Sequence, residues 1–225
     1  MLVKNWMSKK LITIDEGDSM HTAIKLMHEN KIRRLPVTKK GKFIGILTNL
    51  DLNRESASQA TTLAINELNY LIDKIKIKDI MTKKNLKTIS PVDTVEEAAM
   101  IMLNEKIGVL PVVEDGKLLG IITESDIFKV LISMTGIRRG GMQFAFELPD
   151  RPGSIKEVAD MLRAQGGRVL SIMTSYEEAK EGFRHVYIRM TNINKDKLDS
   201  LIEELQKSNL MYMVDNKEKI RKIYS

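Results

Sequence analysis

The chain has 225 residues, of which 43% are hydrophobic and 29% charged, the composition of an ordinary folded protein with room for one or two cores. Its net charge of +6 is spread along the sequence without a helix-turn-helix, zinc-finger or aromatic-basic segment, so we expect no nucleic-acid partner. The lack of cysteine excludes disulfides and thiolate chemistry. Together with the lack of an export signal or an apolar run of membrane-spanning length, it predicts a cytoplasmic protein.

The first 55 residues alternate between short strands and helices. Residues 11–14 predict a strand, and Asp18 or Ser19 can cap the helix that follows, because both side chains accept hydrogen bonds from the free amides of a first turn. Residues 35–38 and 43–47 predict two further strands joined by a tight turn. The helix repeats apolar residues at helical spacing, namely Met20, Ala23, Ile24 and Met27.

The same pattern returns in the second part of the chain. Residues 106–127 match residues 31–52 at 11 of 22 positions, and residues 77–82 match residues 3–8. In the second copy, Asp115-Gly116 separates two apolar runs, which is typical of a tight β-hairpin. Each copy is too small to bury its apolar face alone, so we expect the two to pack around a pseudo-twofold axis with two equivalent sites. Two such sites without a catalytic constellation indicate a sensor more than an enzyme.

A longer segment joins the two copies. Residues 56–76 carry leucine and isoleucine near helical spacing, behind Ser and Thr residues that can cap a helix. We therefore predict a connecting helix. It belongs either to the shared core or to a dimer interface, and the sequence leaves both alternatives open.

One polar motif occurs at the same place in both copies. Thr48 and Asp51 follow a buried-looking strand and open a helix, and Thr123 and Asp126 repeat the arrangement. One interpretation is a capping box, in which hydroxyl and carboxylate satisfy free amides of the first turn. The other is a ligand site, since a helix N-terminus with a hydroxyl suits a phosphate and a nearby carboxylate can accept both hydroxyls of a ribose. The motif alone does not decide between them.

The doubled pattern L-P-V-x-x-x-G-x-x-x-G-I-x-T-x-x-D, preceded in each copy by K-[ND]-x-M-[ST], resembles a tandem pair of cystathionine-β-synthase (CBS) domains, known as a Bateman module. The resemblance implies repeats at 1–55 and 77–135, and an adenine nucleotide (AMP, ADP or ATP) as a regulatory ligand in clefts between them. By the family's pattern, Asp51 and Asp126 would hold the ribose, and Thr48 and Thr123 the phosphate side. The adenine would lie against Thr13, Ile14, Thr88 and Ile89.

The two copies differ beside these clefts. Arg33 and Arg34 of the first copy stand where the second has Gly108 and Val109. A guanidinium group can bind a phosphate through two hydrogen bonds, which Gly and Val do not offer, so the difference predicts unequal sites. The alternative is that the arginines lie on an exposed rim and bind no ligand.

The character of the chain changes at residues 136–141, which we interpret as a hinge. From 142 to 225 the expected order is strand, helix, strand, strand, helix, strand, a ferredoxin-like βαββαβ arrangement. Ser154 and Glu157 predict a capping box for the first of these helices. The expected strands are 142–148, 169–176, 183–190 and 210–214, and the second helix is 197–205. The fold class is therefore α+β.

This order, together with the stretch D-R-P-G-S formed by Asp150, Arg151, Pro152, Gly153 and Ser154, resembles an ACT domain. The resemblance implies a candidate ligand loop at these five residues, where backbone amides around Gly153 would meet the carboxylate of an amino acid. The alternative is a Pro-Gly turn that only leads into a helix. ACT units often pair through their sheets, and Bateman modules pair as well, so we expect a homodimer.

Two CBS domains followed by an ACT domain, with the stretch at 67–82, are similar to the acetoin-utilisation B-type (AcuB-like) proteins. That resemblance implies a non-catalytic regulatory protein associated with acetoin or acetyl-CoA metabolism and acting on an unknown metabolic partner. There is no Walker loop, nucleophile elbow or dinucleotide motif, and His21, His28 and His185 show no metal-ligand spacing. We therefore expect no catalytic residue, no metal and no membrane association. The alternative is a ligand-free assembly subunit that uses the CBS and ACT units for oligomerisation.

Overall fold

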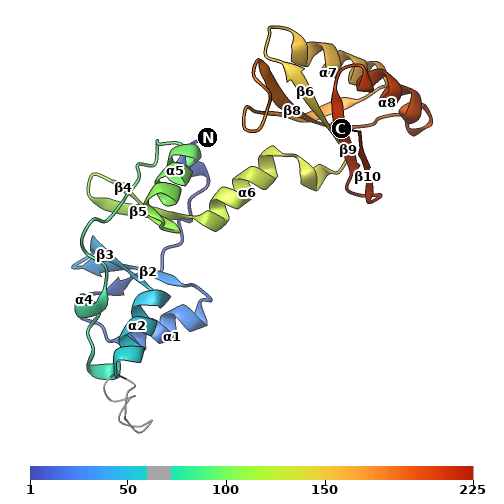
Figure 1. Ribbon diagram of the computed structural model, residues 1–225. Coiled ribbons are helices and arrows are strands. Elements are labelled where there is room, and N and C mark those ends of the chain that lie inside the picture. The colour runs from blue at the N-terminus through green and yellow to red at the C-terminus, as the bar shows by residue number, and fades with distance from the viewer. Residues whose placement is uncertain (60–71, 225) are drawn as a thin grey trace. The chain divides into compact units, whose positions relative to one another are not determined.

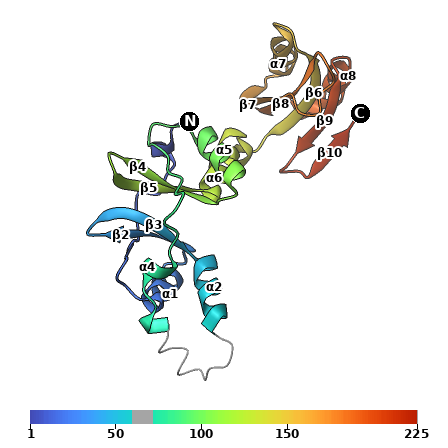
Figure 2. The ribbon, with the colours of Figure 1, turned by 60° about the vertical axis from the view of Figure 1, so that its left-hand side comes forward.

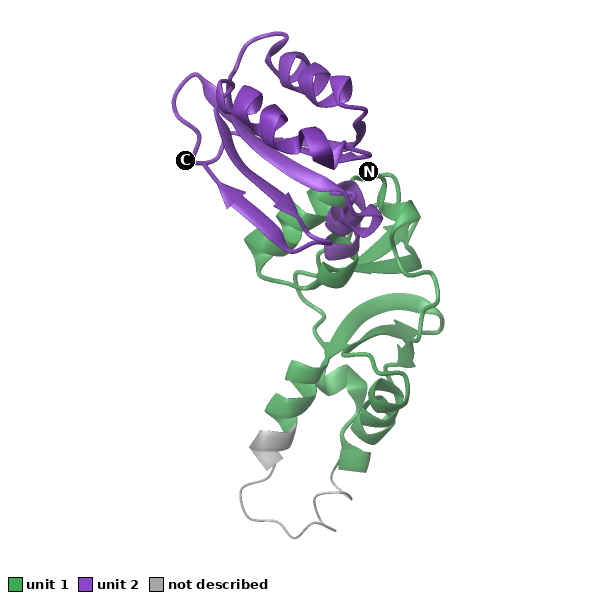
Figure 3. Cartoon of the chain, turned by 90° about the vertical axis from the view of Figure 1, so that its right-hand side faces the viewer, with its two compact units in different colours: residues 1–127 green, residues 128–225 purple. Residues whose placement is uncertain are grey.

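The computed structural model describes residues 1–59 and 72–224 and divides into two compact units, residues 1–127 and 128–225 (Figures 1 and 3). The division falls inside α6 (Glu124–Met134), upstream of the predicted hinge at 136–141. The connecting helix predicted over 56–76 lies for the greater part outside the described residues. It stays a prediction, as do the domain boundaries. No helix within the described ranges has the length and apolarity needed to cross a membrane.

The first repeat builds a three-stranded sheet and two helices. Its elements are β1 (Ile14–Asp15), α1 (Met20–Glu29), β2 (Arg34–Lys39), β3 (Lys42–Thr48) and α2 (Asn49–Gln59), after the short 3-10 helix η1 (Val3–Asn5). β2 lies in the middle, parallel to β1 and antiparallel to β3. The strand predicted at 11–14 is wrong except for its last residue, because the parallel pairing begins only at Ile14, opposite Val37.

Helix α1 begins where the sequence predicted. Of the two candidate caps, Ser19 is the one used, since its hydroxyl accepts a hydrogen bond from the Thr22 amide at 3.2 Å. Three of the four predicted apolar residues are buried, but Ile24 keeps 39% of its surface exposed because it lies at one edge of the apolar stripe. The buried members of the stripe are Met20, Ala23 and Met27.

The second repeat reproduces the first. Its elements are α4 (Ile77–Ile80), α5 (Val95–Glu105), β4 (Val109–Glu114), β5 (Lys117–Thr123) and α6. The hairpin turn at Asp115-Gly116 is confirmed: both residues have positive φ, 48° and 73°, as a type I′ turn requires. Lys40 and Gly41 make the same turn in the first repeat, with φ of 49° and 77°. Both hairpins also carry a bulge at the equivalent place, after Val37 and after Val112.

The N-terminal segment of each repeat pairs with the other repeat. Ser8 and Ile121 form two backbone hydrogen bonds of 2.8 and 3.1 Å, and Thr82 and Ile46 form the equivalent pair at 2.9 and 3.1 Å. The N-terminal segment of the second repeat thereby enters the core of the first, where Ile77 is fully buried. The hairpins of the two repeats meet through β3 and β5 (Figure 2). This exchange makes the two repeats one compact unit.

The C-terminal unit has the element order that the sequence predicted. It contains β6 (Met142–Pro149), α7 (Ser154–Ala164), β7 (Arg168–Ser175), β8 (Phe183–Thr191), α8 (Leu198–Gln206), β9 (Leu210–Asp215) and β10 (Ile220–Ile223). The antiparallel sheet runs β10-β9-β6-β8-β7, which is the ferredoxin-like order with one added edge strand. β10 was not predicted, because four residues that include Arg221 and Lys222 give too weak a strand signal. The core between sheet and helices includes Phe144, Phe146, Leu162, Ile188 and Leu201.

Candidate functional site

A cleft of about 470 Å³ opens between the two repeats. The first repeat contributes the beginning of β2, the end of β3 and the first turn of α2, and the second contributes the loop after α4 and the segment from the end of α5 into β4. The cleft is therefore a joint product of both repeats. Its lining consists of Arg34, Ile46, Thr48, Leu50, Thr82, Asn85, Leu86, Lys87, Glu105, Lys106, Ile107, Gly108, Val109 and Pro111.

Arg34 is the cation that the first repeat places in this cleft. It is the first residue of β2 and pairs with Thr48 across the hairpin. Its guanidinium lies against Gly108 of the second repeat: a Cβ at position 108 would collide with Nη2 of Arg34 and would lie 2.7 Å from a carboxylate oxygen of Glu124. Glycine at this position leaves room for both charged side chains. Arg34 and Gly108, which the sequence placed beside different clefts, thus meet in one.

Positive side chains outnumber negative ones in the cleft. Lys87 and Lys106 of the second repeat line it together with Arg34. Among the described residues of the lining, Glu105 is the one acid, and its carboxylate lies 2.7 Å from Nζ of Lys87. The remaining wall is largely apolar, with Ile46, Leu50, Leu86, Ile107, Val109 and Pro111. Such a cleft can hold a flat apolar ring against one wall and an anionic group against the other.

Both Thr-x-x-Asp motifs have the geometry of a helix cap. Oδ2 of Asp51 accepts hydrogen bonds from the amide and the hydroxyl of Thr48, at 2.8 and 2.7 Å, and the Thr48 hydroxyl accepts from the Asp51 amide at 3.3 Å. Oδ2 of Asp126 accepts the same two bonds from Thr123, at 3.0 and 2.7 Å. Of these four residues, only Thr48 lines the cleft described here. The capping interpretation is therefore realised in both repeats, whether or not a ligand also uses these groups.

The other residues predicted for the nucleotide are not among those that line this cleft. Ile14 and Ile89 are buried in the sheets, with 2% and 3% of their surface exposed. Thr13, Thr88 and Arg33 are exposed. Arg34 and Thr48 are thus the two predicted site residues that the structure brings together in this cleft.

Five polar residues of the cleft lining were missed by reasoning from sequence: Thr82, Asn85, Lys87, Glu105 and Lys106. One signal was present, because the shift between the copies grows from 74 to 75 in the stretch that contains Asn85. Lys106 ends α5 in the left-handed region, with φ of 54°, and its counterpart Lys31 has φ of 52°. The identity of these lysines alone does not predict that the backbone turns toward a cleft here.

In the C-terminal unit, side chains of the candidate ligand loop at 150–154 are bound to other charged side chains of the protein. The predicted capping box of Ser154 and Glu157 is wrong: Gly153 is the N-cap, with φ of 89°, and Ser154 is the first helical residue. Glu157 instead binds Arg151 through two hydrogen bonds of 2.8 Å, which lower the pKa of Glu157. The Ser154 hydroxyl is buried and accepts a hydrogen bond from Arg184 at 3.2 Å.

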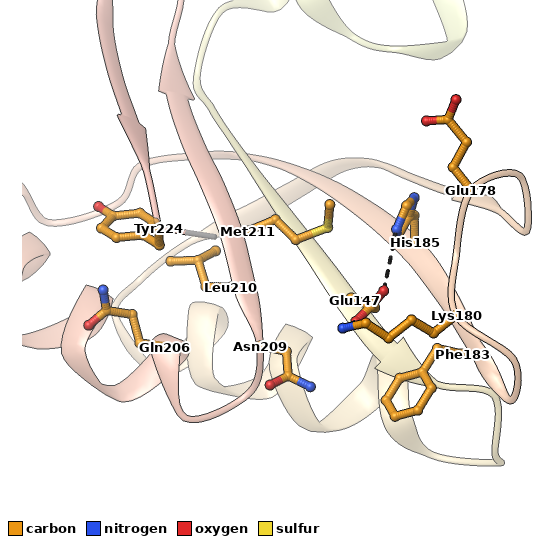
Figure 4. Close-up of a pocket in the computed structure, with 10 residues that line it drawn as sticks. All are labelled: Glu147, Glu178, Lys180, Phe183, His185, Gln206, Asn209, Leu210, Met211 and Tyr224. Carbon is orange, nitrogen blue, oxygen red and sulfur yellow. Dashed lines mark hydrogen bonds and ion pairs between the residues drawn. The ribbon is translucent and has the colours of Figure 1, made fainter.

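A separate cavity of about 760 Å³ lies at one end of the C-terminal sheet (Figure 4). Glu147 is central to it, with Lys180 at 2.7 Å and Nε2 of His185 at 3.8 Å. The hydrogen bond from Lys180 and the nearby His185 lower the pKa of Glu147. The Glu147 carboxylate is therefore already paired within the protein, and Glu178 is a second acid in the lining. In the described ranges, no group of three or more His, Cys, Asp or Glu could hold a metal ion.

Known proteins share the architecture of the first unit. The sequence profile of the CBS domain matches residues 3–58 and residues 77–133, about half of the chain. The chain belongs to the CBS domain family. A CBS domain-containing protein of Dictyostelium discoideum is 36% identical over 138 residues, which cover 60% of this chain and 93% of that protein. The tandem CBS domains thus form the Bateman module that the sequence suggested.

Two solved structures resemble this CBS protein. The CBS domain pair of protein MJ0100, solved in complex with 5′-methylthioadenosine and S-adenosyl-L-methionine, is 30% identical, with a TM-score of 0.50 and coverage of 58% of this chain and 95% of that one. A Vibrio cholerae protein described as an acetoin utilization protein (AcuB) is 26% identical, with a TM-score of 0.52 and coverage of 62% and 96%. Both likenesses support the CBS pair, whose profile match ends at residue 133, before β6 begins.

Proposed function

We propose that this protein is a non-catalytic regulator that senses an adenine nucleotide, AMP, ADP or ATP, in the cleft between its CBS repeats. The observation that carries the proposal is the convergence of Arg34, Lys87 and Lys106 from both repeats on one cleft that also has an apolar wall. The ligands of the MJ0100 pair, 5′-methylthioadenosine and S-adenosyl-L-methionine, share an adenosine group, which supports an adenosyl ligand here.

The cleft matches the two ends of a nucleotide. Guanidinium and ammonium groups bind phosphate oxygens through charge-assisted hydrogen bonds. Arg34 lies beside Thr48 in the lining of the cleft, and Lys106 adds a second such group from the other repeat. Ile107, Val109 and Pro111 offer an apolar surface for adenine. In this proposal the ribose is held by Asp51 or Asp126, each of which would keep its helix cap while accepting a ribose hydroxyl.

The proposal includes no catalytic step. The acid in the cleft lining, Glu105, is paired with Lys87, so neither is placed to act as a free base. We expect purified protein to turn over neither ATP nor acetyl-CoA. Hydrolysis that disappears in Asp126→Ala would contradict this part of the proposal.

We further propose that the C-terminal unit is an ACT domain that relays the nucleotide state to a metabolic partner. The ferredoxin-like strand order and the loop from Asp150 to Ser154 support that assignment. The Vibrio cholerae neighbour supports a role near acetoin metabolism. We also propose a homodimer in the cytoplasm, since a CBS pair and an ACT sheet each offer a surface for pairing. Light scattering should give about twice 25.6 kDa, and a concentration-independent mass near 25.6 kDa would contradict the dimer.

A second function, that of a ligand-free assembly subunit, is favoured by one observation. In both the Thr48–Asp51 and the Thr123–Asp126 pair, the carboxylate accepts hydrogen bonds from the Thr amide and hydroxyl as in a helix cap, so the sequence pattern needs no ligand to explain it.

Calorimetric titration of the full chain with adenosine, AMP, ADP and ATP separates the two functions. The sensor should bind at least one nucleotide saturably, with affinity rising as phosphates are added, because Arg34 and Lys106 give the cleft positive charge beyond the Lys87–Glu105 pair. No binding of any of the four, nor of 5′-methylthioadenosine or S-adenosyl-L-methionine, would contradict the sensor and leave the assembly subunit.

A further inference from the structure

The face of the C-terminal sheet that lies opposite its helices carries a row of polar side chains. Side chains alternate between the faces of a strand, and Phe144 and Phe146 of β6 lie in the core, so Gln143 points to the other face. Arg189 of β8 and Val214 of β9 are the direct neighbours of Gln143, and Arg221 of β10 is the neighbour of Val214. One row across four strands therefore holds two arginines with Gln143 and Val214 between them.

Arg189 is buried without an acidic partner in the part of the chain that the structure describes. It is 3% exposed, and its guanidinium donates to the Gln143 side-chain oxygen at 2.6 Å and, at 3.5 Å, to the Gly141 carbonyl and the Asn216 side-chain oxygen. All three acceptors are neutral, and Nε of Arg189 has no hydrogen-bond partner. Burial lowers the pKa of this guanidinium. A buried cation that lacks a counter-charge is costly and marks a place where an anion would be favourable.

A cavity of about 540 Å³ opens beside Arg189. Arg221 stands at its exposed side, and Ile137, from the short helix η2 (Ile137–Arg139), closes another side. Val214 and Ile223 add apolar surface. Lys222 also borders the cavity, but its ammonium group is 3.0 Å from Asp199 of α8 and is thereby neutralised. No Asp or Glu is among the described residues that line the cavity.

We propose that this cavity binds a small organic carboxylate with an apolar body. The carboxylate would lie between Arg189 and Arg221, where a planar guanidinium can form two parallel hydrogen bonds to it. The apolar body would contact Ile137, Val214 and Ile223. Because no acidic side chain lines the cavity, nothing there would pair with an ammonium group, so the ligand is a simple acid rather than an amino acid. The site is separate from the loop at 150–154 and does not depend on nucleotide binding by the CBS pair.

The site touches the segment that leads from α6 into the C-terminal sheet. The Thr135 carbonyl accepts a hydrogen bond from the Ser171 hydroxyl at 2.9 Å, and Arg189 itself donates to the Gly141 carbonyl. A Cβ at Gly136 would lie 3.7 Å from Cδ of Arg189, so this segment packs on the arginine stem. A carboxylate bound to Arg189 and against Ile137 would therefore hold this segment on the sheet.

Titration of the full chain with hexanoate, followed by NMR of ¹³C-labelled methionine methyl groups, tests the site. Met211 lines the cavity, and Met211→Leu assigns its signal. Hexanoate should shift that signal saturably, whereas hexanamide, which has the same shape without the charge, and inorganic phosphate, which has no apolar body, should not. Equal binding of hexanamide, a response to phosphate alone, or no saturable shift would overturn the proposal.

Variants connect the response to the two arginines. Arg221→Gln should weaken hexanoate about threefold, since Arg221 is exposed, and Arg189→Met should weaken it at least about tenfold, since its charge is buried. Arg168→Gln, on the exposed edge strand β7 and outside the cavity lining, is the matched control and should bind as wild type does. If Arg189→Met does not fold, Arg221→Gln against Arg168→Gln still decides. Equal affinities in those two variants would overturn the proposal.

Discussion

The two CBS repeats agree in their backbone and differ in the charges at their cleft. Both turn their hairpins through two residues of positive φ, both carry a bulge at the equivalent position, and both close a Thr-x-x-Asp cap. Yet Arg34 corresponds to Val109, and Lys87 of the second repeat corresponds to Ile12 of the first. Arg34 and Lys87 both line the one cleft described between the repeats.

This difference separates residues that maintain the fold from residues that select a ligand. A feature present in both repeats is required by the backbone conformation that the repeats share, so its loss should lower stability. A charge present in only one repeat is not required by that backbone, so its loss should change affinity and leave stability nearly intact. The predictions below test this division, from the largest expected effect to the smallest.

Replacing either glycine at the exchanged segments should be the most damaging change. A Cβ at Gly45 would lie 2.7 Å from the Thr82 carbonyl, and one at its counterpart Gly120 would lie 2.6 Å from Sδ of Met7. Such overpacking costs about 1–3 kcal/mol. Gly45→Ala should cost somewhat more than Gly120→Ala, because the backbone oxygen of Thr82 lies at 2.7 Å, whereas at Gly120 the backbone oxygen of Ser8 lies at 2.9 Å and the closer Met7 side chain is flexible. Urea unfolding monitored by circular dichroism measures both.

Gly116→Ala is the control for these two variants. A Cβ there would meet no atom within 4 Å, so its cost comes only from the left-handed backbone, with φ of 73°. That cost should be about 1 kcal/mol. If Gly45→Ala unfolds at the same urea concentration as wild type, the exchange of segments does not hold the repeats together.

The next effect is expected at the two capping aspartates. Asp51→Asn and Asp126→Asn each weaken a charge-assisted cap, at a cost of about 0.5–2 kcal/mol of stability. The loss should be larger for Asp126, which is only 4% exposed. If the carboxylates also hold a ribose, each variant loses a further 1–3 kcal/mol, roughly, in affinity for adenosine at its own cleft. Melting curves and calorimetry on the same samples separate the two effects.

Asp93→Asn is the matched control, because Asp93 accepts a hydrogen bond from the Ser90 amide at 2.8 Å and does not line the cleft. It should lower the melting temperature without changing adenosine binding. If Asp51→Asn and Asp126→Asn behave as Asp93→Asn does, the Thr-x-x-Asp motif is only a helix cap in this protein.

The charge that distinguishes the repeats should act on affinity. Arg34→Gln removes the cation over Gly108 and should weaken ATP about tenfold and AMP less, while adenosine binding stays unchanged. Arg33→Gln removes the same charge from the adjacent residue, which is exposed and does not line the cleft. It should have little effect on nucleotide affinity. Equal losses in both variants would show that long-range charge, rather than contact with phosphate, controls the affinity.

Most of the fold could be predicted because its signals are local. The repeat, the Asp115-Gly116 turn, the Ser19 cap and the βαββαβ order each depend on residues close together in sequence. The errors came where tertiary contacts decide. The strand predicted at 11–14 begins only at Ile14, where its pairing with β2 begins. Ser154 is the first helical residue rather than the cap, and its hydroxyl binds Arg184, thirty positions later.

The candidate site was harder to predict because it is assembled from both repeats. The sequence singled out Arg34 and Thr48 for a cleft between the repeats but did not show which residues of the second repeat they meet there. Contact of Arg34 with Gly108, and the approach of Lys87, follow from the exchange of segments between the repeats. Nothing in the pattern of either copy specifies that exchange, since the same apolar residues could pack within one repeat. The sequence likewise did not predict that Arg189 is buried without an acidic partner among the described residues. It does not show that the face of the sheet around Arg189 lacks acidic side chains.

The smallest effect is expected at the caps of the equivalent helices α1 and α5. Thr94 and Glu97 form a complete capping box in the second repeat: the Glu97 carboxylate accepts from the Thr94 amide at 2.7 Å and from its hydroxyl at 2.9 Å. The first repeat has Ser19 and Thr22 at the same places, so its cap lacks a carboxylate.

The hydrogen bond from the Thr94 amide, helped by the hydroxyl, lowers the pKa of Glu97 below its ordinary value of 4.5. Since the folded state favours the charged form, its contribution to stability is complete above pH 4.5 and is lost as the pH falls through the lowered pKa. Wild type should therefore exceed Glu97→Gln in unfolding free energy by a constant amount at neutral pH, and the gap should close in acid. Thr22→Glu should give the first repeat a similar acid-sensitive gain. A gap between wild type and Glu97→Gln that persists unchanged to pH 3 would show that the capping box does not titrate, and that the caps of the two repeats are equivalent despite their different residues.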